Sequence, residues 1–426
     1  MKNTTQVADM IRMGQLDERL LDIYVDKDSL IYQRQRYLDA ISQFESNFSV
    51  KDISIYSAPG RSEIGGNHTD HQRGEVLVAA VNLDAIAIVQ PTKEEVVEVL
   101  SNGFEKVTVS LADLEKKEEE EGTTKALIKG VLKALQVRGY HLGGFLAYIT
   151  SDVLIGAGLS SSAAFEVLIG TIVSGLYNHM EISPVEIAIM GQYAENVYFG
   201  KPCGLMDQMA SSVGNLVHID FEKENEPVID KVECDFETFG YSLCITDTKS
   251  SHADCTPEYA QVPKEMKQVA AVFGKEVLRQ VTMEELLSKM EEVRTAAGDR
   301  GALRAIHFLT ENERVKKETQ ALNTGDFKSF LQNVKASGDS SFKYLQNVYM
   351  NKDVTHQNVS LALALSEVVL GDCGTCRVHG GGFAGTIQAF VKNEAVNKYQ
   401  KAMNNHFGEG ACSVLKIRKY GGIQVL

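Results

Sequence analysis

Residues 151–177 constrain the fold of this chain more than any other segment. They read SDVLIGAGLSSSAAFEVLIGTIVSGLY, a short apolar stretch that leads through a loop of small residues into a strongly apolar helix. Consecutive small residues at 156–162 let backbone N–H groups turn toward an anion, and the N-terminus of a helix favours phosphate. The segment therefore predicts a loop-to-helix unit that binds phosphate. A tight turn capped by serine explains the same residues, and both interpretations stay open.

The rest of the sequence mixes helix and strand patterns in two halves. Helical spacing of apolar residues occurs within 1–50, 125–137, 184–198, 206–213, 266–309 and 393–406. Strand patterns occur at 53–57, 76–89, 144–150, 216–221, 241–246, 377–391 and 412–425. We therefore predict an α/β protein of two domains, residues 1–215 and 216–426.

Composition and charge narrow the class of protein. Hydrophobic residues make up 44% of the chain and charged residues 23%, which is enough for a sizeable core. Asp and Glu outnumber Lys and Arg by 57 to 43, and this excess argues against general binding to nucleic acid or to anionic membranes. The seven scattered cysteines fit reduced thiols, and the first residues lack a secretory signal pattern. We expect a cytoplasmic protein.

A second polar loop, residues 58–76, carries several residue types that hold polar ligands. It contains Arg61, Asn67, His68, Asp70 and His71 between two predicted strands, with four glycines among them. An arginine there could neutralise a phosphate oxygen, and an aspartate could accept hydrogen bonds from vicinal hydroxyls. A zinc site is a competing interpretation because the two histidines are three residues apart, although no third ligand is evident. A solvated loop is the other alternative.

Two further segments could carry chemistry. In AENVYFGKPCGLMDQMASSVG, residues 194–214, Glu195 and Asp207 stand in apolar surroundings that are unfavourable for unpaired carboxylates. Glu195 could ligate a cation, or it could lie on a solvated helix face. Asp207 could act as a base or orienting group, or it could be a helix N-cap. Three glycines at 380–382 precede an apolar strand and allow a close backbone approach, either to a ligand or in a hairpin turn.

Taken together and in this order, the segments resemble the motifs of the GHMP small-molecule kinases, and among them the galactokinases. The pattern GRxNxxGEHTDY is matched by GRSEIGGNHTDH at 60–71, and GLSSSA stands at 158–163. The pattern AExxxxGxPCGxMDQ is matched at 194–208 with its spacing intact, and GGGFGG is matched by GGGFAG at 380–385. Residues 247–259 are similar to a stretch that places a galactose-contacting tyrosine. The resemblance spans about residues 33–425.

The resemblance implies a fold and a reaction. The expected fold is an N-terminal domain like ribosomal protein S5 and a C-terminal ferredoxin-like α+β domain, with the active site in the cleft between them. The expected activity is transfer of the γ-phosphoryl group of ATP to the anomeric hydroxyl of galactose. The products are galactose 1-phosphate and ADP, and ATP and Mg²⁺ are the expected cofactors. The oligomeric state stays open, a monomer included.

The resemblance also implies roles for individual residues. Asp207 and Arg61 are expected to be catalytic, and Ser162 and Glu195 are expected to hold Mg²⁺. The expected substrate-binding residues are Asn67, His68, Thr69, Asp70, Gly204 and Tyr259. The expected nucleotide-binding residues are Gly156, Ala157, Gly158, Leu159, Ser160, Ser161 and Ser162.

Four positions depart from the first motif and bear on the choice of sugar. Asn67 replaces a glutamate that the family associates with the sugar's O6 hydroxyl, and His71 replaces a tyrosine; Glu63 and Gly65 depart as well. Losing a charge-assisted hydrogen bond at O6 would change binding by about 1–2 kcal/mol. Another sugar, such as N-acetylgalactosamine or L-arabinose, therefore stays an alternative to galactose. A non-catalytic sensor of sugar and nucleotide is a further alternative, against which the retained Arg61, Ser162, Glu195 and Asp207 argue.

Overall fold

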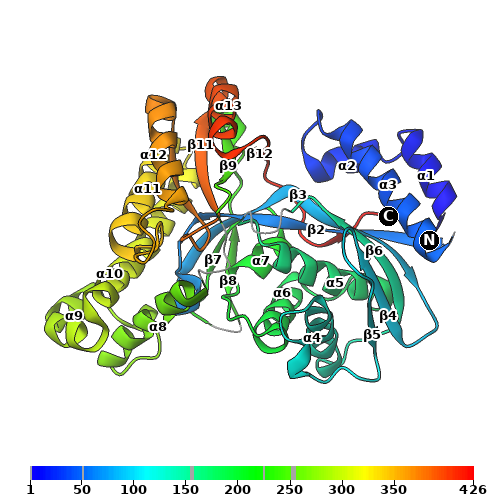
Figure 1. Ribbon diagram of the computed structural model, residues 1–426, viewed down its shortest axis with the longest axis horizontal. Helices are drawn as coiled ribbons and strands as arrows, with labels where there is room; N and C mark the ends of the chain where they lie inside the picture. Colours follow the sequence, from blue (N-terminus) through cyan, green and yellow to red (C-terminus); the bar gives the residue numbers. More distant parts are fainter. Residues whose placement is uncertain (1, 50–51, 154–157, 224–225, 251–255) are drawn as a thin grey trace.

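The computed structural model describes residues 2–49, 52–153, 158–223, 226–250 and 256–426 (Figure 1). Its described strands form two sheets, one of nine strands and one of four. The nine strands are β1 (Lys2–Asn3), β2 (Asp52–Gly65), β3 (Glu75–Pro91), β4 (Val96–Ser101), β5 (Val107–Ser110), β6 (Phe145–Ser151), β7 (Leu216–Asp220), β8 (Val228–Lys231) and β13 (Ile423–Gln424). The strands of the four-stranded sheet are β9 (Tyr241–Asp247), β10 (Gly374–His379), β11 (Thr386–Lys392) and β12 (Cys412–Leu415).

Each stretch with predicted helical spacing contains helix, residues 327–340 and 358–370 form helices that the sequence analysis does not predict, and the predicted α/β class is confirmed. In the first half they are α1 (Thr4–Arg12), α2 (Asp17–Tyr24), α3 (Leu30–Phe48), α4 (Thr124–Val137), α5 (Ser161–Tyr177), α6 (Pro184–Tyr193), the π-helix η3 (Ala194–Phe199) and α7 (Met206–Val213). In the second half they are α8 (Thr256–Val272), α9 (Met283–Ser288), α10 (Met290–Asn323), α11 (Phe327–Ser340), the π-helix η6 (Ser341–Leu345), α12 (Asn358–Leu370) and α13 (Val396–Phe407).

Strand pairing shows where the chain passes from one sheet to the other. The large sheet runs in the order β1-β2-β3-β6-β4-β5, and β7 and β8 continue it from β3. Its last strand, β13, returns from the end of the chain to pair with β2. The chain therefore changes sheet between Lys231 and Tyr241, beyond residue 215. The division into domains 1–215 and 216–426 stays a prediction.

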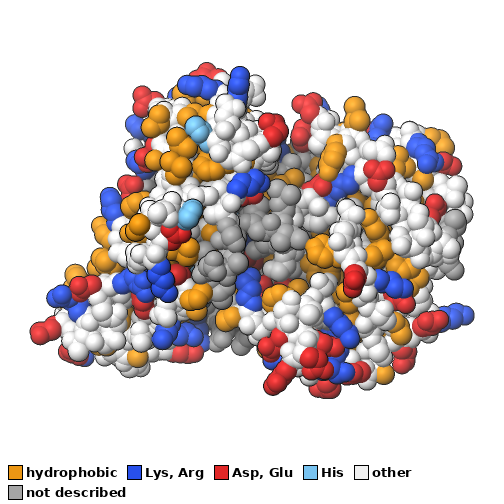
Figure 2. Space-filling view, viewed as in Figure 1, with side chains coloured by type: hydrophobic (Ala, Val, Ile, Leu, Met, Phe, Trp, Pro, Cys, Tyr) orange, Lys and Arg blue, Asp and Glu red, His pale blue; other side chains and the backbone are white. Residues whose placement is uncertain are grey.

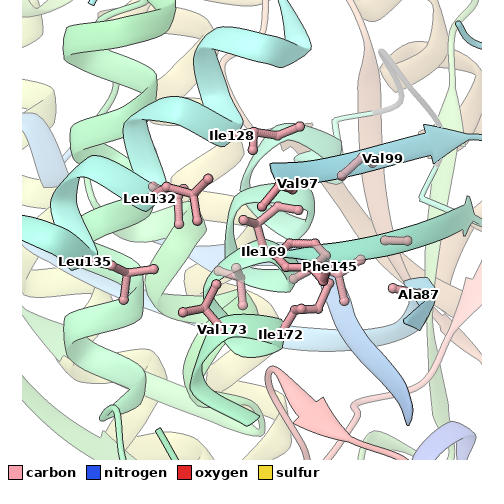
Figure 3. Close-up of a cluster of buried hydrophobic side chains, with 14 of the residues drawn as sticks. Ala87, Val97, Val99, Ile128, Leu132, Leu135, Phe145, Ile169, Ile172 and Val173 are labelled. Atoms are coloured by element: carbon pink, nitrogen blue, oxygen red, sulfur yellow. The ribbon is translucent and has the colours of Figure 1, made fainter. Parts of the chain in front are cut away.

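Both faces of the large sheet are covered by helices (Figure 1). Successive side chains of a strand point to opposite faces, and β3 shows this clearly. Ala85, Ala87 and Val89 pack with α4 and α5, whereas Ile86 and Ile88 pack with α1–α3. Figure 3 shows the first of these clusters, in which strand residues such as Phe145 face residues of α4 and α5. Burial on both faces explains the nearly continuous apolar sequence of β3.

A separate cluster joins the two sheets. It includes Ile64 and Leu77 from the large sheet, Leu243 and Phe390 from the small sheet, and Phe330 of α11. Because these side chains are buried together, the polar segment at 58–76 is held against the elements that carry the four-stranded sheet.

The outer surface carries charges of both signs. Figure 2 shows acidic and basic side chains intermixed over the face of the molecule that it displays. Among the helices in the described ranges, none has the length and apolar content that crossing a membrane requires.

Candidate active site

An ion pair joins the polar segment at 58–76 to the segment around Asp207. Arg61 lies on β2 next to an irregularity in its pairing with β3, and Asp207 lies in the first turn of α7. Arg61 Nε donates to Asp207 Oδ1 (2.6 Å) and Arg61 Nη2 donates to Oδ2 (2.9 Å). Arg61 Nη1 donates to the carbonyl oxygen of Gly158. Three segments that lie far apart in the sequence therefore meet at one guanidinium group.

The electrostatics of this pair keep both groups charged. Burial alone would raise the pKa of Asp207, but Arg61 and a hydrogen bond from Ser160 lower it below its ordinary value. Asp207 pairs through its carboxylate and is not the N-cap of α7, a position that Leu205 occupies. The Asp207 side chain keeps 28% of its surface exposed, against 6% for Arg61. The carboxylate can therefore be reached by a substrate.

The loop before α5 contributes through its backbone and one hydroxyl. Gly158 and Ser160 both have positive φ, at 68° and 56°. For serine this left-handed conformation is uncommon and is found often at functional sites. Ser160 Oγ donates to Asp207 instead of capping α5, so the serine-cap interpretation does not apply to it. Leu159 is buried in the core, and Ser161 begins α5.

Gly156 and Ala157 lie outside the described residues.

A second polar cluster lies at the first turn of α5. Ser162 Oγ donates to Glu195 Oε1 (3.0 Å), and Lys201 Nζ donates to the same oxygen (3.1 Å). Glu195 is 2% exposed, so it does not occupy a solvated helix face. Partial loss of water around the ammonium group opposes the charge of Lys201, but Glu195 and Asp207 raise its pKa above the ordinary value. The predicted pair of cation ligands is thus brought together beside the loop.

Sequence reasoning missed two members of this cluster. Gln208 Nε2 donates to Glu195 Oε2 (2.9 Å) and to Glu166 Oε2 (3.0 Å), and all three side chains are buried. Burial and the charge of Glu195 raise the pKa of Glu166 well above its ordinary value. Glu166 follows Ser162 by four residues, so helical spacing would have placed both on one face of α5.

The cluster fits a magnesium ion that is completed by a nucleotide. No group of three or more His, Cys, Asp or Glu side chains poised to hold a metal occurs in the described part of the chain. Ser162 and Glu195 offer two hard oxygen ligands, and Mg²⁺ commonly takes few protein ligands together with phosphate oxygens and water. Nearby, Glu166 Oε1 and Gln208 Oε1 are buried without a hydrogen-bond partner among the described residues. Such oxygens suit the hydration shell of an ion.

Asp70 and Gly204 form a close contact near Asp207. The backbone N–H of His71 donates to Asp70 Oδ1 (2.9 Å). A Cβ atom on Gly204 would overlap the Asp70 carboxylate, so only glycine fits there. Burial and the negative charge of Asp207 raise the pKa of Asp70 to about 6. Two predicted site residues are therefore neighbours, and the carboxylate titrates near neutral pH.

His68 and Tyr259 both contact the glycine-rich loop 380–382. The His68 Nε2 atom is 2.9 Å from the carbonyl oxygen of Gly381, and burial lowers the pKa of His68 to about 4. The hydroxyl of Tyr259 donates to the carbonyl oxygen of Gly382 (2.7 Å). A Cβ atom on Gly381 would overlap the Tyr259 ring, which explains why this loop needs glycine. The loop thus joins two predicted sugar-contacting residues.

Asn67 is held entirely by protein groups. Its Nδ2 donates to Glu63 Oε1 (3.0 Å) and Gly380 O (2.7 Å), while its Oδ1 accepts from Ser341 (3.1 Å) and Asn347 (2.8 Å). An amide has two N–H donors and one oxygen with two lone pairs, so these bonds use its whole capacity. A contact between Asn67 and the O6 hydroxyl stays a prediction.

Thr69 is also used within the protein. Its hydroxyl lies 2.9 Å from Gly66 O and 2.6 Å from Glu75 O, and the side chain is buried. Thr69 therefore shapes the loop before Asp70.

Comparison with known families accounts for these segments. Residues 126–215 match the model of the GHMP kinases N terminal domain, and residues 42–91 match the galactokinase galactose-binding signature. The first match contains Ser160, Glu195 and Asp207, and the second contains Arg61 and Asp70.

Solved structures share the fold over most of the chain. The galactokinase of Lactococcus lactis, solved with galactose, is 22% identical and has a TM-score of 0.78; the similarity covers 90% of this chain and 98% of that one. The mevalonate kinase of Methanococcus jannaschii is 16% identical, with a TM-score of 0.60 and coverage of 86% and 98%. The phosphomevalonate kinase of Streptococcus pneumoniae, solved with phosphomevalonate and AMPPNP, is 14% identical, with a TM-score of 0.56 and coverage of 84% and 98%.

Proposed function

Because this chain is a GHMP kinase that carries the galactokinase galactose-binding signature, we propose that it phosphorylates galactose at the anomeric hydroxyl with ATP. The observation that carries the proposal is the two-pronged contact between Arg61 and Asp207. This contact joins the galactose-binding signature at 42–91 to the segment at 126–215 that matches the GHMP kinases N terminal domain. The lactococcal relative was solved with galactose, which supports the same substrate class.

The reaction needs positioning and charge stabilisation more than covalent chemistry. A bond forms between the anomeric oxygen and the γ-phosphorus while the bond from that phosphorus to the β–γ bridging oxygen breaks. ADP leaves with the electron pair of the broken bond. The hydroxyl proton passes to the Asp207 carboxylate and then to solvent. Because Arg61 keeps the pKa of Asp207 low, we assign Asp207 mainly to orienting the hydroxyl, with proton acceptance late in the transfer.

Arg61 supplies positive charge to the transferred group. Its guanidinium is held on one edge by Asp207 and bonds to the backbone of the nucleotide loop at Gly158. A preorganised cation of this kind stabilises the negative charge that develops in the transition state. Ser162 and Glu195 would hold Mg²⁺, which neutralises charge on the phosphate oxygens when it is bound.

The sugar would lie near the contact of Asp70 with Gly204. An ionised Asp70 can accept hydrogen bonds from two neighbouring hydroxyls, and His68 and Tyr259 border the same region through the glycine loop. Since the Asn67 amide is occupied by protein groups, a kinase for another sugar remains the second candidate.

MgATP-dependent release of ADP with a panel of free sugars at equal concentration tests the proposal. Turnover that is highest with galactose is the expected result. Turnover only with another sugar would keep the kinase mechanism and overturn galactose. Absence of turnover with every sugar, together with intact ATP binding, would overturn the enzyme and favour the sensor.

A further inference from the structure

Lys201 lies in the loop that connects η3 to α7. Its backbone N–H donates to Glu195 O (3.1 Å), and the backbone N–H of Cys203 donates to Asn196 Oδ1 (2.6 Å). These bonds hold the loop against η3. The Lys201 side chain is nevertheless 60% exposed. The backbone of this lysine is therefore fixed while its long side chain borders solvent-accessible space.

The ammonium group shares an acceptor with the proposed cation site. Lys201 Nζ is 3.1 Å from Glu195 Oε1, the oxygen that also accepts from Ser162 Oγ at 3.0 Å. The charge of Asp207 also acts on this ammonium group. Lys201 therefore lies beside the carboxylate assigned to the metal, and it also feels the charge of the carboxylate assigned to the sugar hydroxyl. A phosphate oxygen bound to a cation at Ser162 and Glu195 would therefore lie close to this ammonium group.

Lys201 also has hydrogen-bonding capacity beyond its bond to Glu195. An ammonium group has three N–H donors, and among the described side chains Glu195 is its acceptor. Arg61 already directs three of its five donors to Asp207 and Gly158. A phosphoryl group in transfer distributes negative charge over three oxygens, so a second, mobile donor would be useful there.

We propose that Lys201 is a second catalytic cation of this site, donating a hydrogen bond to an oxygen of the phosphoryl group that is transferred. The inference rests on the proposed function. Lys201 keeps its proton throughout and forms no covalent bond, so the bonds made and broken are those already given. It occupies a position of the motif AExxxxGxPCGxMDQ that admits any residue, which is why the motif alone does not single it out.

The test compares Lys201→Gln with Lys201→Arg and with a control, Lys117→Gln. Lys117 is an exposed lysine that also pairs with a carboxylate, Asp113, at 2.7 Å. For each protein, kcat with sugar and MgATP is measured, and calorimetry with Mg²⁺ gives the affinities for ADP and for AMPPNP. A thermal unfolding curve checks that each variant is folded.

We expect Lys201→Gln to lower kcat by about tenfold to a hundredfold, the range of a charge-assisted hydrogen bond. Its affinity for AMPPNP should fall more than its affinity for ADP, because only the former has a γ-phosphate. Lys201→Arg should restore part of kcat and part of the affinity for AMPPNP. Lys117→Gln should change neither kcat nor the nucleotide affinities.

A different result would overturn the inference. If Lys201→Gln changes only the Mg²⁺ concentration needed for half-maximal rate, then Lys201 merely neutralises Glu195. Failure of the proposed function looks different, because the unaltered protein would then release no ADP with any sugar. The nucleotide affinities are measured without sugar, so they test Lys201 in either case.

Discussion

Asp84 and Asp207 both pair with arginine, but they differ in what surrounds them. Asp84 accepts from Arg36 (2.7 Å), Arg418 (2.8 Å) and the hydroxyl of Tyr24 (2.9 Å), and it is fully buried. Asp207 pairs with Arg61 and Ser160 and stays partly exposed. Around Asp84 the charges compensate one another away from solvent, whereas at Asp207 a substrate can still reach the carboxylate.

The comparison separates a structural role from a chemical one. Asp84 lies on β3 and holds together α2, α3 and the segment before β13, which are distant in the sequence. Both arginines lower the pKa of Asp84 despite its burial. Through these partners Asp84 stabilises the packing of the segments around it. Asp207 forms a similar ion pair in the first turn of α7. There the arginine also lowers the pKa of the carboxylate, which is therefore charged and accessible to a ligand.

The largest effect is expected from Asp84→Asn. Removing this charge leaves Arg36 and Arg418 buried with insufficient counter-charge, which typically costs about 3–5 kcal/mol. Denaturant unfolding should show a loss of this size in the free energy of unfolding, while the turnover of the molecules that remain folded stays close to normal. Asp113→Asn, which breaks an exposed pair with Lys117, is the control and should cost less than about 1 kcal/mol. Equal losses of unfolding free energy in the two variants would contradict a structural role for Asp84.

Asp207→Asn should show the reverse pattern. Loss of an orienting and proton-accepting group lowers turnover by about a hundredfold to ten-thousandfold, and partial exposure makes the cost in stability smaller than for Asp84→Asn. Steady-state kinetics measure kcat, and calorimetry checks that the affinity for ATP is kept. Turnover near that of the unaltered protein would exclude Asp207 from the mechanism.

Asn67→Ala lies between these two cases. The substitution removes the partner that Ser341 and the carbonyl oxygen of Gly380 have in the amide, and an unsatisfied buried group costs about 1–3 kcal/mol. We expect lower stability in denaturant unfolding, together with an unchanged preference for galactose over 6-deoxygalactose. A changed preference would show that Asn67 contacts the O6 hydroxyl after all.

The sequence predicts the elements of the fold well because their patterns are local. The nearly continuous apolar run in β3 and the spacing of apolar residues in α4 depend on neighbouring residues, so the segments at 76–89 and 125–137 could be placed without a structure. The return of β13 to β2 and the pairing of β7 with β3 join distant segments. Nothing local in the sequence encodes those pairings.

The same reasoning explains which parts of the site could be predicted. The meeting of Arg61 with Asp207 follows from motifs whose order and spacing are specific. The partners of Asn67 do not, because Ser341 and Asn347 lie in η6 and just after it and belong to no motif. Lys201 stands within a motif but at one of its unrestricted positions. The unpredicted contacts are thus those made across the fold by residues without a pattern.

The smallest effect concerns the pH dependence of Asp70, whose pKa of about 6 makes it the opposite of Asp84. If the sugar needs the ionised carboxylate, kcat/KM for the sugar should rise about tenfold between pH 5 and 7, as the fraction of ionised Asp70 increases. A profile of initial rates against pH measures this, and Asp70→Asn should remove the rise at a lower overall kcat/KM. A rise that persists in Asp70→Asn would assign the titration to another group.

Stability should change with pH in opposite directions at these two carboxylates. The pKa of Asp70 is raised in the folded protein, so its contribution to stability is present below the unfolded pKa of about 4 and is lost as the pH rises through about 6. The pKa of Asp84 is lowered, so its contribution is present above about 4 and is lost as the pH falls. Unfolding free energies measured from pH 4 to 7 should therefore rise more steeply with pH in Asp70→Asn than in the unaltered protein. Parallel curves would contradict the raised pKa of Asp70, and with it the idea that this site gives up stability to keep a carboxylate ready for the sugar.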